Sequence, residues 1–195
     1  MKEALKNLVD IISDRRTIKP DQYSGAVLDD SLIQKILEQA NWAPTHGYTE
    51  PWRFVVYKGA ALERLGEFLA NFNQGDPEAP DFNKIRYNRI KSRPSMASHV
   101  IGIAMLPGTN PKIPEIEEVS AVAMAVQNMW LTCHAMGLGA YWSTGKAAFS
   151  DEFCEFMGFD KQYKSLGLFY IGATEKNNPP GRRISNIDTK VRWES

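Results

Sequence analysis

NWAPTHGYTEPWRFVVY, residues 41–57, connects a predicted helix to a predicted strand. Pro44 ends the helix, and Gly47 accepts backbone angles that other residues resist. The run after Pro51 is rich in β-branched and aromatic residues, which is typical of a buried strand. Polar groups are dense between the two prolines, and loops held on a rigid frame often carry binding groups. The stretch therefore predicts a helix–loop–strand unit whose loop either binds a ligand or only makes the turn.

Helices and strands continue on both sides of this unit. Helical spacing of apolar residues predicts helices over residues 3–13, 31–42, 60–72, 115–136 and 150–157. Apolar runs predict buried strands over residues 52–57, 99–106 and 166–174, and a short strand followed by a tight turn within 137–145. No repeat and no linker divides the chain, so we expect a single domain over residues 1–195.

The composition is that of a soluble globular protein, with 43% hydrophobic and 24% charged residues and a formal net charge of zero. This balance implies no attraction to nucleic acid or to an anionic membrane. The amino terminus begins an amphipathic pattern rather than a signal peptide, and no apolar run is long enough to span a bilayer. Cys133 and Cys154 lack metal or redox spacing. We therefore expect reduced, packed cysteines, a cytoplasmic location, and neither a nucleic-acid nor a membrane partner.

Two basic stretches offer sites for anions. Arg15, Arg16, Thr17 and Lys19 form a compact set of donors that suits phosphate oxygens, or else a solvated basic turn. Residues 82–93 interleave five basic residues with aromatic and aliphatic ones. We interpret this second stretch as a solvated helix that borders an anionic small-molecule site and acts as a mobile lid. A nucleic-acid module is the alternative.

The predicted helix over residues 115–136 carries an apolar seam at alternating three- and four-residue steps: Val119, Val122, Val126, Met129, Cys133 and Met136. Such a seam suits helix–helix packing, either in the core of the domain or at a homodimer interface.

Hydrolase and metal chemistry find little support. The three histidines are far apart without metal spacing, and we expect His99 to be a satisfied edge residue rather than a catalyst. No Gly-x-Ser-x-Gly elbow occurs. Trp142 stands where a dinucleotide fingerprint needs its third glycine. The turn at Ser143, Thr144 and Gly145 instead offers backbone amides that can face a ligand.

Four pieces, in this order along the chain, resemble the nitroreductase family of flavin enzymes. They are Arg15-Arg16-Thr17-Ile18-Lys19, Ala43-Pro44-x5-Glu50-Pro51-Trp52-Arg53-Phe54, the turn from Tyr141 to Gly145, and the Pro-Pro-x-Arg-Arg of residues 179–183. The short chain and His46 resemble the smaller, single-domain branch. The resemblance implies an α+β fold, with a mainly antiparallel sheet flanked by helices. It also implies a homodimer with FMN between the subunits and a C-terminal tail that reaches over the partner.

The resemblance also assigns residues to the phosphate end of the cofactor. Arg15 and Thr17 would contact the FMN phosphate and ribityl chain, with Arg16 alongside. Lys19 would lie near the pyrimidine end of the isoalloxazine, where a positive charge stabilises the reduced flavin. Either Arg182 or Arg183 would complete the phosphate clamp.

A second set would surround the ring. His46 and Glu50 would come from the dimer partner's side of the site. Relatives often carry glutamine where Glu50 stands, and a carboxylate there opposes the reduced anion. The ring would be lined by Trp142, Ser143 and Thr144, and a backbone amide of the turn that ends at Gly145 would donate to flavin N5.

The implied activity is FMN-dependent oxidoreduction, in which NADPH or NADH reduces the flavin and an electron-poor acceptor such as a nitroaromatic or quinone then replaces it. This reaction needs no side-chain nucleophile or general base, so we assign no catalytic residue and no metal ligand. Alternatives are other flavin chemistry on the same scaffold (dehalogenation, dehydrogenation or flavin breakdown) and a non-enzymatic FMN-binding or sensing protein.

Overall fold

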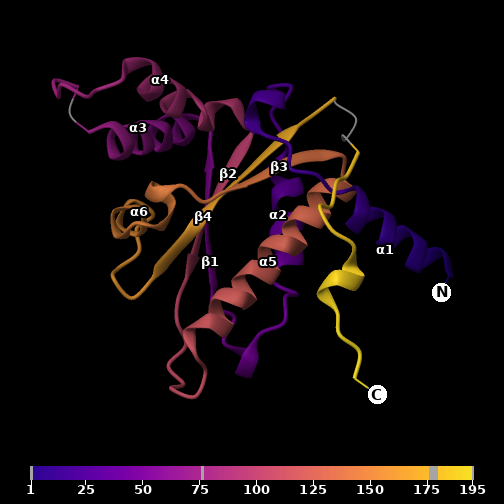
Figure 1. The fold of residues 1–195 in the computed structure, drawn as a ribbon. Helices are drawn as coiled ribbons and strands as arrows, with labels where there is room; N and C mark the ends of the chain where they lie inside the picture. The colour runs from indigo at the N-terminus through magenta and orange to yellow at the C-terminus, as the bar shows by residue number, and fades with distance from the viewer. Residues whose placement is uncertain (1, 76, 176–179, 195) are drawn as a thin grey trace.

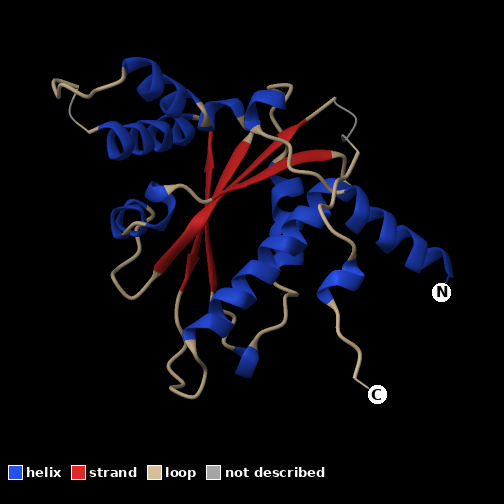
Figure 2. Cartoon of the chain, in the orientation of Figure 1, coloured by secondary structure: helices blue, strands red, loops and turns tan. Residues whose placement is uncertain are grey.

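A four-stranded antiparallel sheet organises the protein, whose computed structural model describes residues 2–75, 77–175 and 180–194 (Figures 1 and 2). The strands are β1 (Trp52–Lys58), β2 (His99–Met105), β3 (Leu138–Ser143) and β4 (Lys164–Ala173), in the order β1-β2-β4-β3. Every neighbouring pair is antiparallel. The α+β class and the antiparallel sheet predicted from the sequence are confirmed.

Helices cover both faces of the sheet (Figure 2). One face carries α2 (Asp30–Ala40) and α5 (Glu115–Ala135), and the other carries α3 (Ala60–Gln74) and α6 (Asp151–Phe156). The helix α4 (Lys84–Ser92) packs on α3. Short 3₁₀ turns lie at Pro20–Gln22, His46–Tyr48, Pro94–Met96, Lys146–Phe149 and Ile187–Lys190.

Side chains that alternate along the strands feed two separate cores. On β2, Ile101 and Ile103 join the core under α2 and α5, whereas Val100 joins the core under α3 and α6. This alternation follows from the two-residue period of a strand. The seam of α5 points into the first of these cores, where Val126 and Met129 are fully buried. Val122, Val126, Met129 and Cys133 of the seam are thus buried in the domain core, whereas Val119 is partly buried and Met136 is 37% exposed.

Three details differ from the sequence predictions. The strand at residues 52–58 lies at an edge of the sheet and is only partly buried, because β2 is the one strand that pairs with β1 among the residues described. Trp42 does not close the apolar face of α2: the helix ends at Ala40, and Trp42 is 82% exposed. His99 lies on the central strand β2 rather than at an edge. Its ring is nevertheless satisfied, with Nδ1 2.9 Å from Ser98 Oγ and Nε2 3.1 Å from Asp30 Oδ1.

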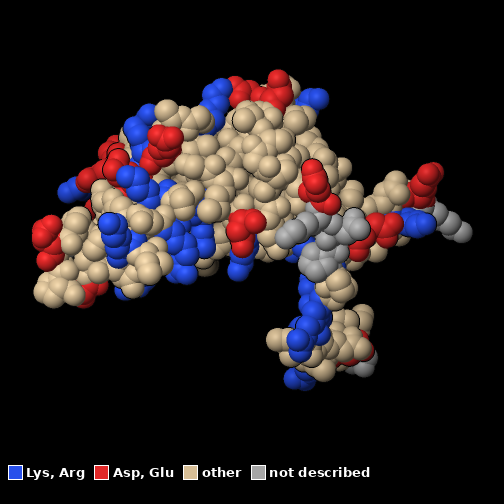
Figure 3. Space-filling model, turned by 90° about the horizontal axis from the view of Figure 1, so that it is seen from above, with Lys and Arg blue, Asp and Glu red and all other residues tan. Residues whose placement is uncertain are grey.

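Two segments extend away from the body of the molecule (Figures 1 and 3). They are α1 (Lys2–Asp14) and the C-terminal segment of residues 180–194. Four apolar side chains of α1 are between 49 and 61% exposed: Leu5, Leu8, Val9 and Ile12. Ile184 and Trp193 of the C-terminal segment are also almost fully exposed. Within the described residues, no helix combines the length and apolar character needed to cross a bilayer.

Candidate functional site

The segment of residues 15–19 runs along β3. The Ile18 amide donates to the carbonyl of Ala140 at 3.1 Å, and the Ile18 carbonyl accepts from the Tyr23 hydroxyl at 3.0 Å. Ile18 is buried by these contacts, while Thr17 and Lys19 on either side of it are exposed. The edge of the sheet therefore holds the predicted anion-binding side chains at the surface.

Arg15 is the most informative residue of this segment. Its guanidinium lies over the Trp130 ring, 4.6 Å from the ring centroid, which is a cation–π arrangement. Arg15 Nη1 and Trp130 Nε1 are both buried and have no hydrogen-bond partner in the described part of the chain. Buried donors are rarely left unpaired in proteins, so two of them side by side suit an acceptor from outside the chain.

Positive charge gathers around Arg15. Burial, and after it the neighbouring Arg16 and Arg183, lower the pKa of Arg15. The C-terminal segment lies directly on Arg16, since a Cβ at Gly181 would be 2.2 Å from Arg16 Nη2. We call Arg15, Arg16 and Arg183 the arginine cluster. Arg182 is exposed, and its carbonyl accepts from Arg183 Nη1 at 3.0 Å. Guanidinium groups gathered in this way suit a phosphate.

The loop of residues 45–50, here the His46 loop, has a constrained backbone. Gly47, Tyr48 and Glu50 adopt positive φ values of 61°, 55° and 43°. A non-glycine residue in this region is uncommon and costs conformational energy. The Glu50 carbonyl is held by Arg53 Nη1 at 2.9 Å. Strain of this kind persists only where surrounding contacts impose it.

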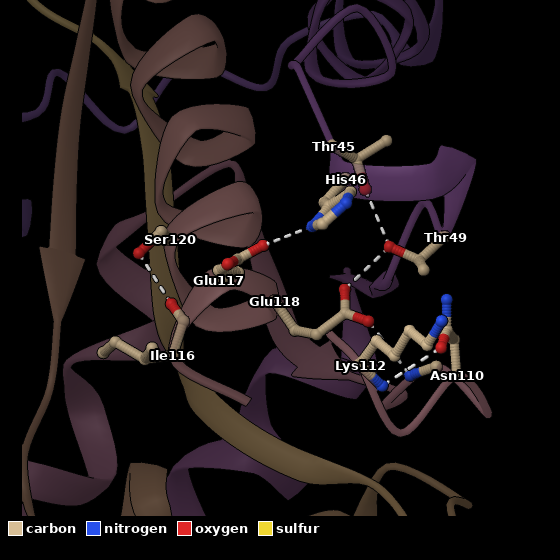
Figure 4. A network of polar contacts seen from close by, with 10 residues as sticks. Thr45, His46, Thr49, Asn110, Lys112, Ile116, Glu117, Glu118 and Ser120 are labelled. Atoms are coloured by element: carbon tan, nitrogen blue, oxygen red, sulfur yellow. Dashed lines mark hydrogen bonds and ion pairs between the residues drawn. The ribbon is translucent and has the colours of Figure 1, made fainter. Parts of the chain in front are cut away.

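Those contacts come from the first turn of α5 (Figure 4). Glu118 is 3% exposed and accepts from the Thr49 hydroxyl at 2.7 Å and from the Gly108 amide at 3.1 Å. Thr49 is in turn 2.7 Å from the Thr45 hydroxyl. His46 Nδ1 lies 2.6 Å from Glu117 Oε2. Sequence reasoning missed Glu118, because acidic residues in the first turn of a helix are ordinary.

The arginine cluster and the His46 loop do not meet within one chain. The cluster rests on Trp130 and the loop on Glu117, and these residues are thirteen positions apart on α5. At 1.5 Å per residue, that separation is about 20 Å. The arginine cluster and the His46 loop therefore lie toward opposite ends of the helix.

The third predicted group follows β3. Trp142 packs on the core under α5 and donates from Nε1 to the Leu166 carbonyl at 3.1 Å. Ser143 and Gly145 line a pocket of ≈ 140 Å³, and Thr144 is exposed. The Gly145 carbonyl accepts from the Ala148 amide at 2.9 Å, which starts a 3₁₀ turn. The described residues contain no group of three or more His, Cys, Asp or Glu side chains arranged to hold a metal ion.

The sequence model of the nitroreductase family matches residues 12–173, which is most of the chain. The chain belongs to the nitroreductase family. The matched region contains the segment of residues 15–19, the His46 loop and the turn after β3, but not Arg182 or Arg183.

Individual relatives agree with this assignment. The "Putative NAD(P)H nitroreductase YfhC" of Bacillus subtilis is 24% identical over 170 residues, covering 87% of this chain and 85% of that protein. The crystal structure of a nitroreductase-like family protein from Bacillus cereus superposes with a TM-score of 0.83 at 23% identity, covering 96% and 95% of the two chains. The FMN-dependent nitroreductase NfnB of Mycobacterium smegmatis, crystallised with NADPH, has a TM-score of 0.74 at 16% identity, with 98% and 100% coverage. The nitroreductase-like fold predicted from the sequence is thereby confirmed.

Proposed function

We propose that this nitroreductase-family protein is an FMN-dependent NAD(P)H oxidoreductase that reduces small electron-poor acceptors such as nitroaromatics or quinones. The observation that carries the proposal is the pair of unpaired buried donors on Arg15 and Trp130 inside the arginine cluster. The name of the Bacillus subtilis relative and the NfnB complex support the choice of cofactor and co-substrate.

The residues at the arginine cluster fit the phosphate end of FMN. Arg15 Nη1 would find an acceptor in a phosphate oxygen, and the charge that Arg16 and Arg183 add would favour a dianionic group. Thr17 is exposed on the same segment and offers a hydroxyl donor. Lys19, two residues further along, would place its charge toward the pyrimidine end of the flavin.

Bound FMN would supply the redox chemistry, accepting a hydride from NAD(P)H and passing electrons to the acceptor in a ping-pong cycle. The chain itself would bind and orient. A backbone amide of the turn at Ser143–Gly145 would donate to flavin N5, and Lys19 would stabilise negative charge on the reduced ring. No side chain is assigned as an acid, base or nucleophile.

The active form would be a homodimer with FMN between the subunits. Within one chain, the His46 loop lies too far from the arginine cluster for both to contact the same FMN. A second copy of the chain would bring its own His46 loop to that FMN. The exposed apolar residues of α1 and of residues 180–194 supply surface for that contact. The C-terminal segment would then reach over the partner subunit.

The decisive experiment is an absorption spectrum of the purified protein before and after anaerobic addition of NADPH and then NADH. A flavin band that bleaches supports the proposal. A band that persists with both nucleotides favours a binding or sensing protein. Absence of a band after FMN is supplied contradicts the proposal. A marked preference for one acceptor outside nitroaromatics and quinones would favour dehalogenation, dehydrogenation or flavin breakdown.

The phosphate role has its own test. Arg15→Ala removes a charge-assisted hydrogen bond worth about 1.5–3 kcal/mol, so the FMN dissociation constant should rise roughly 10- to 100-fold. The measurement is fluorescence titration of apoprotein with FMN. Arg64→Ala on an exposed site of α3 is the matched control. Equal dissociation constants for the two variants would count against the phosphate role of Arg15.

A further inference from the structure

Three arginines form a stripe along one side of α4. Consecutive residues of a helix turn by about 100°, which places Arg86, Arg89 and Arg93 within a sector of about 60°. Arg93 is the C-cap residue and keeps helical φ and ψ angles. Lys84 and Lys91, the other basic residues of α4, fall on the opposite side.

The opposite side is the one that α3 occupies. Lys91 Nζ lies 3.1 Å from Glu67 Oε1, and the Tyr87 hydroxyl donates to Asn71 Oδ1 at 2.9 Å. A salt bridge thus neutralises the charge of Lys91. The arginine stripe, by contrast, is exposed and forms no salt bridge within the described residues. Figure 3 shows Lys and Arg side chains, with Asp and Glu among them, on the side of the molecule where α3 and α4 lie.

One end of the stripe opens on the turn that we assign to the flavin. Ile90 and Arg93 of α4 line the pocket of ≈ 140 Å³ whose other walls include Ser143 and Gly145. Arg86 lies about 10 Å from Arg93 along the helix axis. The stripe therefore begins beside the proposed N5 contact and leads away from it across the surface.

We propose that Arg86, Arg89 and Arg93 bind the phosphates of the reduced dinucleotide and select NADPH over NADH. The inference rests on the proposed function, because a hydride donor must place its nicotinamide at flavin N5. With the nicotinamide at N5, the phosphates of the dinucleotide must lie along one wall of the pocket. The helix α4 forms one such wall, and its arginine stripe carries positive charge that no described carboxylate neutralises. Guanidinium forks match phosphate oxygens, and the additional phosphate of NADPH gives the stripe a group that NADH lacks.

The test compares two variants that each lose two positive charges. Arg89→Gln/Arg93→Gln alters the stripe, and Lys35→Gln/Lys84→Gln alters exposed positions away from it. Calorimetric titration with adenosine 2′,5′-bisphosphate measures phosphate binding to FMN-supplied protein without turnover. Stopped-flow reduction of the flavin gives kcat/KM for NADPH and for NADH.

We expect the dissociation constant of the bisphosphate to rise about tenfold in the stripe variant, with a similar fall in the NADPH/NADH ratio of kcat/KM. In the control variant, the bisphosphate dissociation constant and the NADPH/NADH ratio should each change by no more than about twofold, since only long-range charge is altered. Binding of the bisphosphate to the wild type should weaken as the salt concentration rises. If the stripe variant still reduces flavin and its NADPH/NADH ratio of kcat/KM is unchanged, the inference is overturned. This holds whether the two kcat/KM values stay the same or fall equally. Failure of the wild type to take up FMN would overturn the proposed function instead, while the bisphosphate titration would still decide whether the stripe binds phosphate.

Discussion

Tyr57 carries a buried hydroxyl without a hydrogen-bond partner in the described part of the chain. The side chain is 7% exposed on the α3–α6 side of the sheet, where its ring stacks on Phe156 with centroids 5.9 Å apart. Burial raises the pKa of this hydroxyl to about 12. A buried polar group that lost its water and gained no partner destabilises the folded state. The ring, rather than the hydroxyl, therefore explains why the position is aromatic.

Tyr57→Phe should raise the free energy of unfolding by about 1 kcal/mol at pH 7, because it removes the unpaired hydroxyl and keeps the ring. The raised pKa also has a pH signature. Above the unfolded pKa of about 10, the hydroxyl ionises in the unfolded chain but not in the folded one, so the free energy of unfolding falls as the pH rises toward 12. The variant should lack this alkaline loss. Urea unfolding at pH 7 and pH 11 checks both points, with Tyr48→Phe as a solvent-exposed control, and a lower midpoint at pH 7 would contradict the argument.

At the same scale, sequence reasoning found the residue types of the candidate site but not their partners. The donor-rich set at residues 15–19 is local, so it can be recognised from the chain alone. The contact of Arg15 with Trp130 and the support of Thr49 by Glu118 join residues far apart in the sequence. Residue type and spacing do not predict such a contact, because the two side chains come together only in the folded chain.

Among the secondary-structure elements, the apolar pattern of the sequence located helices by their spacing and strands by continuous apolar runs. It did not predict the order β1-β2-β4-β3, since the alternation of apolar residues in a strand says nothing about its neighbours. It also left open which surface the α5 seam contacts. One sequence feature alone indicates the close packing of α3 and α4, namely a glycine inside the helical pattern of α3.

That glycine, Gly66, allows the backbone of α4 to approach α3. A Cβ at this position would lie 2.0 Å from the Lys91 carbonyl oxygen. Helix propensity alone favours Gly66→Ala by up to about 1 kcal/mol, whereas overpacking against backbone costs about 1–3 kcal/mol. We expect the clash to dominate and the variant to be destabilised by about 1–2 kcal/mol in urea unfolding. A stabilised Gly66→Ala variant would show that α4 moves away freely.

On the scale of the whole molecule, α1 is amphipathic but covers little of its own chain. Leu5, Leu8, Val9 and Ile12 remain about half exposed, although their spacing places them on one face of the helix. The C-terminal segment likewise leaves Ile184 and Trp193 in solvent. Apolar surface left exposed on projecting segments is typical of an interface with another chain.

Leu8→Asp should weaken the proposed homodimer, because it places a charge on the apolar face of α1. Burying one leucine contributes about 1.5–3 kcal/mol, so the dimer dissociation constant should rise at least tenfold. Analytical ultracentrifugation across a concentration series measures this change, and FMN retention should fall with it. Asn7→Asp, at the adjacent polar position, introduces the same charge and should leave the dimer intact. A monomeric wild type that binds FMN would contradict the shared site.

The separation of the arginine cluster from the His46 loop along α5 has a genetic consequence. In a dimer that shares its sites, each flavin takes the arginine cluster from one chain and the His46 loop from the other. An allele damaged only in the cluster and an allele damaged only in the loop would each encode an inactive homodimer. Mixed dimers of the two would contain one doubly damaged site and one intact site. Two defective alleles in the same cell would thus restore part of the activity that neither has alone.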